Sequence, residues 1–361
     1  MLRLEPRAQT SQVWRYASPL LALVITVVLG IILFVALGKD PVRGLGVFFW
    51  EPIKSVYALS ELMVKATPLL LIALGLAVCF RSNVWNIGAE GQFVMGAVFA
   101  SGVALTADAS TGAGFWLLIL LAGVVGGMAW AGLTAFLRDR FHANEILVSL
   151  MLVYVAIMLL NFLVYGPWKD PLGYNFPQTK TFDTITQIPK LISGTRVNVG
   201  VLMALVGVGA LWVFLFRTHA GFAQQVGGLA PDAARYAGFS SRKALWLALL
   251  TSGATAGLAG GLEVAGPLRQ LTPFVPVGYG FAAIIVAFVG RLHPVGMVLS
   301  AVLLSMFYIG GELAQSRLGL PRSLTGVFQG LLLFTLLACD TLMQYRVRWM
   351  PRTNAAKTEA L

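Results

Sequence analysis

Apolar residues recur along this chain in stretches of about 20, the length that one bilayer-crossing helix needs. The polar segments between them reach about 30 residues at most, which is too short for a separate soluble domain. The pattern therefore predicts one transmembrane domain over residues 1–361. Ten spans are expected, near residues 17–37, 56–80, 87–107, 115–137, 146–165, 197–216, 244–265, 279–290, 295–313 and 323–343.

The span near residues 279–290 is too short to cross an apolar core of about 30 Å. Arg291, His293 and Pro294 interrupt the apolar run directly after it. Half-helices occur at membrane depth where they are buried in protein or line a cavity. We therefore expect a half-helix or a steeply placed segment at this position.

Composition supports this interpretation, because 58% of the residues are hydrophobic and only 11% are charged. A soluble domain would hold about a quarter charged residues. The predicted fold class is an all-α integral membrane protein, a polytopic bundle of about ten transmembrane helices.

The net charge of +11 is explained by topology rather than by a nucleic-acid partner. With the N-terminus inside, fifteen Lys and Arg residues fall on the cytoplasmic side and ten on the outer side. Such an excess on the cytoplasmic side sets orientation, so we expect both termini inside, membrane lipid around the bundle and no nucleic-acid partner. Residues 1–16, 217–243 and 346–361 are then cytoplasmic, and residues 166–196 form an extracytoplasmic loop.

Four charged or amide side chains stand out inside the spans. Glu61 and Lys65 share a helix face and can pair with each other, either as an ion pair at the outer interface or as a polar lining for a water-filled path. Glu90 and Glu263 are further carboxylates at membrane depth, where charge is costly and usually functional.

Two spans carry ladders of small residues with a period of four. Gly123, Gly127 and Ala131 form one, and the other is Gly253, Gly257 and Gly261. Small residues let helix backbones approach closely in lipid. We expect tight packing within one subunit; a seam that opens and closes is the alternative.

The run from Asn83 to Gln92 places polar groups at the entrance of a membrane helix. On a continuous helix Asn86 and Glu90 share one face, while Gln92 lies on the other with Gly88 and Gly96. One face must pack against a helix and the other can meet the pathway. We favour a helix-packing role that shapes a gate over direct substrate binding.

The loop of residues 217–243 contains the signals of a short helix. Pro231 suits a first helical turn, Asp232 favours the positive end of the helix dipole, and Gly238 supplies a stop. The sequence predicts a surface-lying helix of about two turns. It is either an ordinary connector or a knob that docks into a partner.

Motifs for enzymatic chemistry are absent from the sequence. There is no G-x-x-x-x-G-K-[ST], no H-E-x-x-H, no cysteine cluster and no G-x-S-x-G. The three histidines fall in separate turns. We therefore expect no enzyme, no metal site and no cofactor bound by this chain.

Five motifs occur in order along the chain: N-I-G-A-E-G-Q at 86–92, N-E-I-L-V-S-L-M-L at 144–152, A-P-D-A-A-R-Y-A-G at 230–238, G-Y-G-F at 278–281 and G-R-L-H-P-V-G at 290–296. Together they resemble permease subunits of ATP-binding-cassette importers of the ribose and branched-chain amino acid class. The nucleoside importers that work with basic-membrane-protein-type binding lipoproteins are the most similar branch. The resemblance covers residues 56 to 340.

This resemblance implies a type II importer permease with about ten transmembrane helices in each of two permease subunits. The second permease is a different chain or another copy of this one. ATP and Mg²⁺ would be bound by separate ATPase subunits, and an extracytoplasmic lipoprotein or periplasmic protein would deliver the substrate. The location implied is the bacterial cytoplasmic, or inner, membrane.

The resemblance also assigns a role to the loop at 217–243. D-A-A-x-x-x-G is similar to the E-A-A-x-x-x-G coupling loop of importer permeases, although the usual I-x-L-P does not follow it. The implied contacts to the ATPase are Pro231, Asp232, Ala233, Ala234, Arg235 and Gly238.

The function implied is a permease subunit for a nucleoside or a related sugar-containing solute. A simple sugar or an amino acid is also compatible with the motifs. The rival hypothesis is an ion-coupled secondary transporter of a small polar solute. Residues that would shape the pathway or gate, or carry coupling ions, are Glu61, Lys65, Asn86, Glu90, Gln92 and Glu263.

Overall fold

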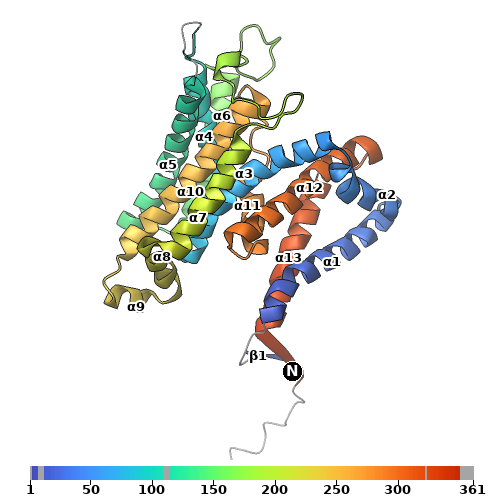
Figure 1. Cartoon of the computed structure of the whole chain (residues 1–361), viewed down its shortest axis with the longest axis vertical. Helices are drawn as coiled ribbons and strands as arrows, with labels where there is room; N and C mark the ends of the chain where they lie inside the picture. Colours follow the sequence, from blue (N-terminus) through green and yellow to red (C-terminus); the bar gives the residue numbers. More distant parts are fainter. Residues whose placement is uncertain (1, 7–11, 109–111, 113, 322, 350–361) are drawn as a thin grey trace, which may run out of the picture. The chain divides into compact units, whose positions relative to one another are not determined.

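Each of the ten apolar stretches forms a helix in the computed structural model, which describes residues 2–6, 12–108, 112, 114–321 and 323–349. Residues 1, 7–11 and 350–361 of the two predicted cytoplasmic tails lie outside the described residues. The ten helices, labelled in Figure 1, are α1 Gln12–Ala36, α3 Val56–Arg81, α4 Ala89–Ala104, α5 Phe115–Phe141, α6 Glu145–Tyr165, α7 Gly200–Arg217, α10 Ser241–Glu263, α11 Tyr279–Val289, α12 Pro294–Leu318 and α13 Leu324–Gln344.

Within the described part of the chain, eight of these helices are long and apolar enough to cross a membrane. The exceptions are α4 and α11. The 16 residues of α4 rise about 24 Å and the 11 residues of α11 only about 16 Å. The sequence-based prediction of a short helix near 279–290 is therefore confirmed, and α11 ends well short of a full crossing.

The remaining elements are short. They are the helices α2 Pro41–Leu45, α8 His219–Leu229 and α9 Pro231–Tyr236, the π-helical turns η1 Gly46–Trp50 and η4 Val264–Leu268, and the 3₁₀ turns η2 Glu51–Ile53 and η3 Thr184–Thr186. Strands β1 Leu2–Pro6 and β2 Tyr345–Trp349 form a two-stranded antiparallel ladder, with Leu2 opposite Trp349. The all-α prediction is otherwise confirmed.

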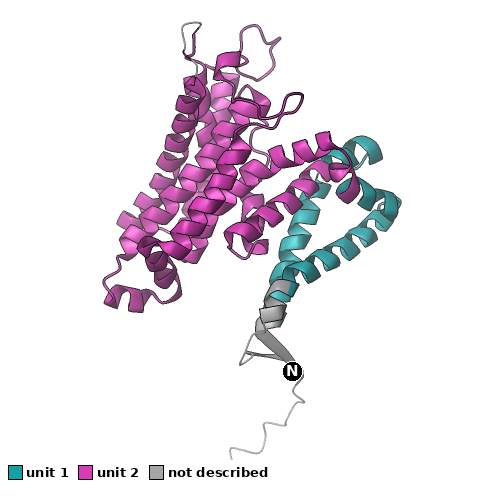
Figure 2. Ribbon diagram, in the orientation of Figure 1, with its two compact units in different colours: residues 1–48, 311–361 teal, residues 49–310 magenta. Residues whose placement is uncertain are grey.

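The chain divides into two compact units, residues 1–48 with 311–361 and residues 49–310 (Figure 2). In the smaller unit, α1 lies along α13, and the hydroxyl groups of Thr26 and Thr335 are hydrogen-bonded at 3.0 Å. The rings of Phe34, Phe48 and Phe328 form a cluster with centroids 4.8–5.9 Å apart. The sequence predicts one membrane domain. The boundary between the two units falls inside helix α12, between residues 310 and 311.

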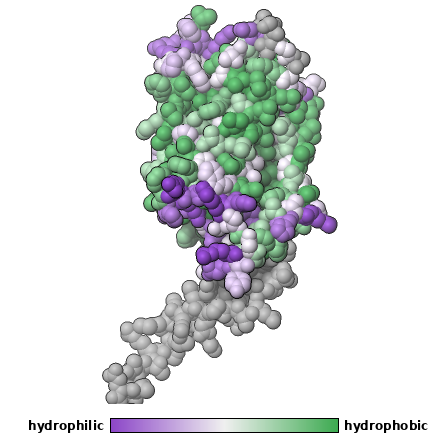
Figure 3. Space-filling model, turned by 90° about the vertical axis from the view of Figure 1, so that its left-hand side faces the viewer, coloured by the Kyte–Doolittle hydropathy of each residue, from purple (hydrophilic) through white to green (hydrophobic). Residues whose placement is uncertain are grey.

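In the larger unit, α3 is the most enclosed membrane helix and packs against α10, α11 and α7, while α4, α5 and α10 pack on one another. Helices α8 and α9 lie at one end of this unit, and the loop of residues 166–196 lies at the other (Figure 1). On the face drawn in Figure 3, apolar side chains form a broad band between two polar zones. This pattern is that of a bundle surrounded by lipid.

The two glycine ladders meet each other along α5 and α10. A Cβ on Gly127 would lie 2.6 Å from the Cα of Gly257, and one on Gly253 would lie 2.5 Å from the carbonyl oxygen of Gly127. Gly96 of α4 joins this contact, because a Cβ on Gly96 would lie 2.5 Å from the carbonyl oxygen of Gly257. Backbone therefore faces backbone where three helices meet, which confirms the predicted packing within one subunit.

Replacing Gly257 by valine should prevent this packing, because the nearest atoms to its new Cβ are backbone atoms of Gly123 and Gly127 on α5, all within 3.0 Å. We expect a loss of about 3 kcal/mol or more in stability, beyond ordinary overpacking. Thermal unfolding of the detergent-solubilised protein measures it. Gly132→Ala on α5 is the control, since its Cβ would meet only Leu250 at 3.8 Å. Equal unfolding temperatures for the two variants would contradict the interpretation.

Candidate functional site

The short helix α11 begins at a carboxylate supplied by α4. Glu90 is 1% exposed, and its Oε1 accepts the N–H of Gly278 at 2.8 Å while its Oε2 accepts the N–H of Gly280 at 2.5 Å. The first N–H groups of a helix lack partners inside it, and the positive end of the dipole favours an anion. Glu90 thus satisfies the start of a helix that begins inside the bundle.

Glycines on α11 make this contact possible. Gly278 has a φ of +86°, a left-handed conformation that residues with a Cβ rarely adopt. A Cβ on Gly280 would lie 2.5 Å from the Cα of Glu90. The G-Y-G-F motif therefore places the α11 N-terminus directly against the start of α4.

The run before α4 also holds the other end of α11. Trp85 and Phe80 lie beside Phe288, with ring centroids 6.3 Å and 5.0 Å from it, and both pairs are stacked. The segment of residues 81–92 thus contacts α11 near both of its ends. This segment therefore contributes to the position of the short helix α11.

The prediction that Asn86 and Glu90 share a helix face is wrong, because α4 begins only at Ala89. The buried Asn86 side chain instead pairs with Gln92 through two amide hydrogen bonds of 3.1 and 3.2 Å. Its Nδ2 also donates to Ser252 of α10 at 2.9 Å, and its Oδ1 accepts the N–H of Gly88 at 3.0 Å. Asn86 therefore forms a turn that starts the helix and joins it to α10.

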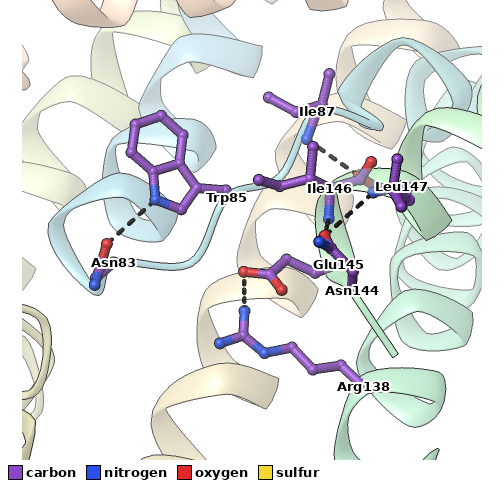
Figure 4. Close-up of polar contacts among 9 residues, drawn as sticks. Asn83, Trp85, Ile87, Arg138, Asn144, Glu145, Ile146 and Leu147 are labelled. Carbon is purple, nitrogen blue, oxygen red and sulfur yellow. Dashed lines mark hydrogen bonds and ion pairs between the residues drawn. The ribbon is translucent and has the colours of Figure 1, made fainter. Parts of the chain in front are cut away.

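A second polar group surrounds the turn between α5 and α6 (Figure 4). Asn144 caps α6 by accepting the N–H groups of Ile146 at 2.9 Å and Leu147 at 3.4 Å. Arg138 at the end of α5 forms an ion pair with Glu145. The N-E-I-L motif is thus a helix start whose acidic residue is paired with the preceding helix.

The predicted coupling helix exists as α9, with Pro231 in its first turn. It ends in a Schellman motif: the N–H of Phe239 donates to the Ala234 carbonyl at 2.9 Å and that of Gly238 to the Arg235 carbonyl at 3.1 Å. Gly238 has a φ of +82°, as this cap requires. Of the α9 residues only Ala234 is buried, so the helix presents the rest of its surface outward.

Helix α8 was not expected from the sequence, because three glycines lie within residues 219–229 and each costs about 1 kcal/mol in a helix. Tertiary contacts override this propensity. A Cβ on Gly228 would lie 2.9 Å from the backbone of Ser82, and one on Gly221 would lie 2.9 Å from that of Leu215. The available signal was Thr218, whose hydroxyl caps α8 by accepting the N–H of Gly221 at 3.0 Å.

A cavity of about 750 Å³ lies between α8, α9 and the ends of α3, α5 and α10. It brings together the two regions that the sequence singled out, the run after α3 and the coupling loop. On one side of it, Asp139 accepts hydrogen bonds from Arg242 at 2.7 Å and from Trp246 at 3.1 Å, which joins α5 to α10. Residues of both regions on its wall are Ser82, Asn83, Val84, Pro231, Ala234 and Gly238.

The other predicted pathway residues lie toward the end of the unit that carries the long loop. Glu61 forms an ion pair with Arg196 of that loop, with the Arg196 Nε 2.9 Å from Oε1, a partner that the spacing to Lys65 did not predict. The hydrogen bond to Glu61 raises the pKa of Arg196, and the negative charge of Glu263 adds to the effect. The Nζ of Lys65 lies 5.8 Å from the ring centroid of Tyr279 in α11.

No group of three or more His, Cys, Asp or Glu side chains that could hold a metal ion is found among the described residues. Most of the residues described above lie near helix ends or in turns. The candidate site consists of the short helix α11, the segment that contacts it, and the α8–α9 loop.

Several known proteins that resemble this chain are permeases. A family model described as "branched-chain amino acid transport system / permease component" matches residues 58–337. The chain is 33% identical to the glucose ABC transporter permease protein of Haloferax volcanii, over 96% of this chain and 93% of that protein. It is 27% identical to the guanosine ABC transporter permease protein of Bacillus subtilis, over 86% and 89% of the two chains.

A third relative is the nucleoside ABC transporter permease protein of Lactococcus lactis subsp. cremoris, 26% identical over 88% of this chain and 89% of that protein. No solved structure matches the chain. The resemblance to importer permeases, including the nucleoside branch, is confirmed by these relatives.

Replacing Glu90 by glutamine should weaken the start of α11, because an amide NH₂ would then face one of the two backbone N–H donors. A hydrogen bond to a charged group contributes about 1.5–3 kcal/mol, so we expect a lower unfolding temperature and reduced transport. Glu145→Gln, at the turn before α6, is the control for removing a carboxylate. Unchanged assembly and transport in Glu90→Gln would leave the carboxylate without a functional role.

Proposed function

Because the chain belongs to the branched-chain amino acid transport system permease component family, we propose that it forms part of the pathway by which an ATP-binding-cassette importer carries a nucleoside or a related sugar-containing solute. The relatives named for guanosine, nucleosides and glucose support this substrate class. The chain is a multi-pass membrane protein, and we place it in the bacterial cytoplasmic membrane with both termini inside.

The observation that carries the proposal is the outward-facing helix α9 at one end of the larger unit. Tyr236 is 98% exposed and Leu229, just before α9, is 87% exposed. An exposed tyrosine is a typical anchor for a protein partner, and the exposed leucine beside it adds apolar surface. We propose that Pro231 to Gly238 contacts a separate ATPase subunit.

Hydrolysis belongs to that partner, since this chain has no P-loop to bind ATP. ATP and Mg²⁺ would be held by the ATPase, whose closure would displace α9 and switch the pathway between outward-open and inward-open states. A second permease, either a different chain or a copy of this one, would complete the pathway. This chain would supply part of the translocation pathway and the helix α9 that contacts the ATPase.

An extracytoplasmic binding protein would deliver the solute at the opposite end. The loop of residues 166–196 there exposes large side chains at its tip: Leu172 at 87%, Tyr174 at 94% and Phe176 at 65%. Its base is fixed to the segment after η4, because the N–H of Thr179 donates to the Leu271 carbonyl at 3.0 Å and that of Phe182 to the Arg269 carbonyl at 2.8 Å. A fixed base with an apolar tip supports a docking role for this loop.

The ion-coupled alternative depended on free carboxylates at membrane depth. Glu61 is paired with Arg196, and Glu90 is satisfied by two backbone N–H groups. The named relatives are all ABC permeases. The importer is therefore the better-supported function.

The energy source separates the two functions. Uptake into proteoliposomes that hold this chain with its second permease, ATPase and binding protein should require ATP and should survive an ionophore that collapses ion gradients. The measurement is accumulation of labelled guanosine, another nucleoside or glucose, with and without ATP. Uptake that continues without ATP and stops with the ionophore would support the secondary transporter.

Replacing Gly238 by valine should uncouple the ATPase, because the left-handed residue that ends α9 would then be strained by about 1–2 kcal/mol. A Cβ at this position would meet nothing within 4 Å, so backbone strain rather than a collision of the Cβ is the expected cause. We expect a several-fold loss of ATPase stimulation by the loaded binding protein.

The control is Gly38→Val, just after α1, where φ is +67° and a Cβ would likewise meet nothing within 4 Å. It introduces the same strain away from α9. Full stimulation in Gly238→Val would show that α9 does not transmit the signal.

A further inference from the structure

Arg81, the last residue of α3, joins three elements that are distant in sequence. Its Nε donates to the carbonyl of Leu292, in the turn between α11 and α12, at 3.0 Å. Its Nη1 donates to Oε1 of Gln225 in α8 at 2.9 Å. The guanidinium carbon lies 5.5 Å from the ring centroid of Phe216, near the end of α7.

The contact between α3 and α8 is rigid. Ser82 donates to Oε1 of Gln224 at 2.7 Å, directly beside the bond between Arg81 and Gln225. Gln225 also donates to the Leu215 carbonyl at 2.7 Å, and Gly228 approaches the backbone of Ser82 too closely for a Cβ. A displacement of α8 therefore carries the end of α3 with it.

The other side of Arg81 meets a strained turn. Arg291 and Leu292 have φ values of 58° and 53°, and two consecutive left-handed residues with side chains are disfavoured. Arg81 is bonded to the carbonyl of the second residue, so it stabilises this conformation of the turn. Such strain is held only while neighbouring contacts maintain it.

This turn follows the C-terminal end of α11 and connects it to α12. Glu90 holds the start of α11, and Leu292 lies a few residues after its end. A short helix held at two ends by polar contacts is suited to move as one piece when one contact changes.

We propose that Arg81 is the positioning residue that transmits movement of the α8–α9 loop to the short helix α11. Displacement of α8 by the ATPase shifts the guanidinium, which releases or re-forms its bond to the Leu292 carbonyl and lets the strained turn change conformation. This inference rests on the proposed function, because it assumes that α9 receives the ATPase.

The test uses the complete importer in proteoliposomes, with ATP hydrolysis and uptake measured on the same sample and normalised to assembled complex. Arg81→Lys keeps the charge but lacks the planar fork that donates in two directions and stacks on a ring. Gln225→Ala removes the α8 acceptor. Each variant should lower uptake per ATP hydrolysed about tenfold while hydrolysis persists.

The double variant should lose no more than either single variant, since both act on one contact. Arg140→Lys is the matched control, an exposed arginine at the end of α5. It should leave the uptake per ATP unchanged.

Three results would overturn the inference. The first is an unchanged uptake per ATP in either variant, and the second is a parallel fall of uptake and hydrolysis. The third is loss of assembly in either variant, which would make the contact merely structural.

The wild-type complex tests the proposed function separately. If its uptake does not need ATP the proposed function fails, whereas a coupled wild type with fully coupled variants refutes only the role of Arg81.

Discussion

A helix that starts inside a membrane exposes N–H groups that lipid cannot satisfy, and this constraint organises the larger unit of the protein. Helix α11 is such a helix, and the Glu90 carboxylate accepts two of the N–H groups at its start. Phe80 at the end of α3, the Trp85 ring and Glu90 at the start of α4 all contact this short helix. Without Glu90, the amides at its start would have to find other partners inside the bundle.

The carboxylate is useful only if α4 cannot move, and the glycine contacts provide that rigidity. Gly96 of α4, Gly127 of α5 and Gly257 of α10 bring three backbones into contact. Close approach of this kind gains dispersion energy along the whole helix pair and leaves little room for sliding. The scaffold formed by α4, α5 and α10 is therefore stiff, and α11 is a small element held against it by a few directional bonds.

An importer permease must change conformation while its subunit stays folded. A stiff scaffold beside a short helix held by hydrogen bonds is consistent with that requirement. The α8–α9 loop stands at one end of the unit with most of α9 exposed, and Arg81 places it two hydrogen bonds away from the turn after α11. A displacement of the loop can therefore reach α11 through these two hydrogen bonds. The long loop with Arg196 paired to Glu61 marks the opposite end.

Local patterns in the sequence were sufficient for the helical membrane class, the short span near residue 285, the glycine contacts and helix α9. Each follows from hydropathy, spacing or a capping signal that lies within one segment, such as Pro231 and Gly238. Helix α8 could not be predicted in this way, since its glycines argue against a helix and only their close contacts with Ser82 and Leu215 explain it.

The sequence by itself determined which side chains are too polar for the membrane, but only the tertiary structure decided their partners. Asn86 pairs with Gln92, Glu61 with Arg196, and Glu90 with the amides of α11. The last two of these contacts join residues more than a hundred positions apart. Helical periodicity predicts which residues are neighbours within one helix. A buried polar group must also find a hydrogen-bond partner, and that partner is whichever donor or acceptor the tertiary packing places beside it.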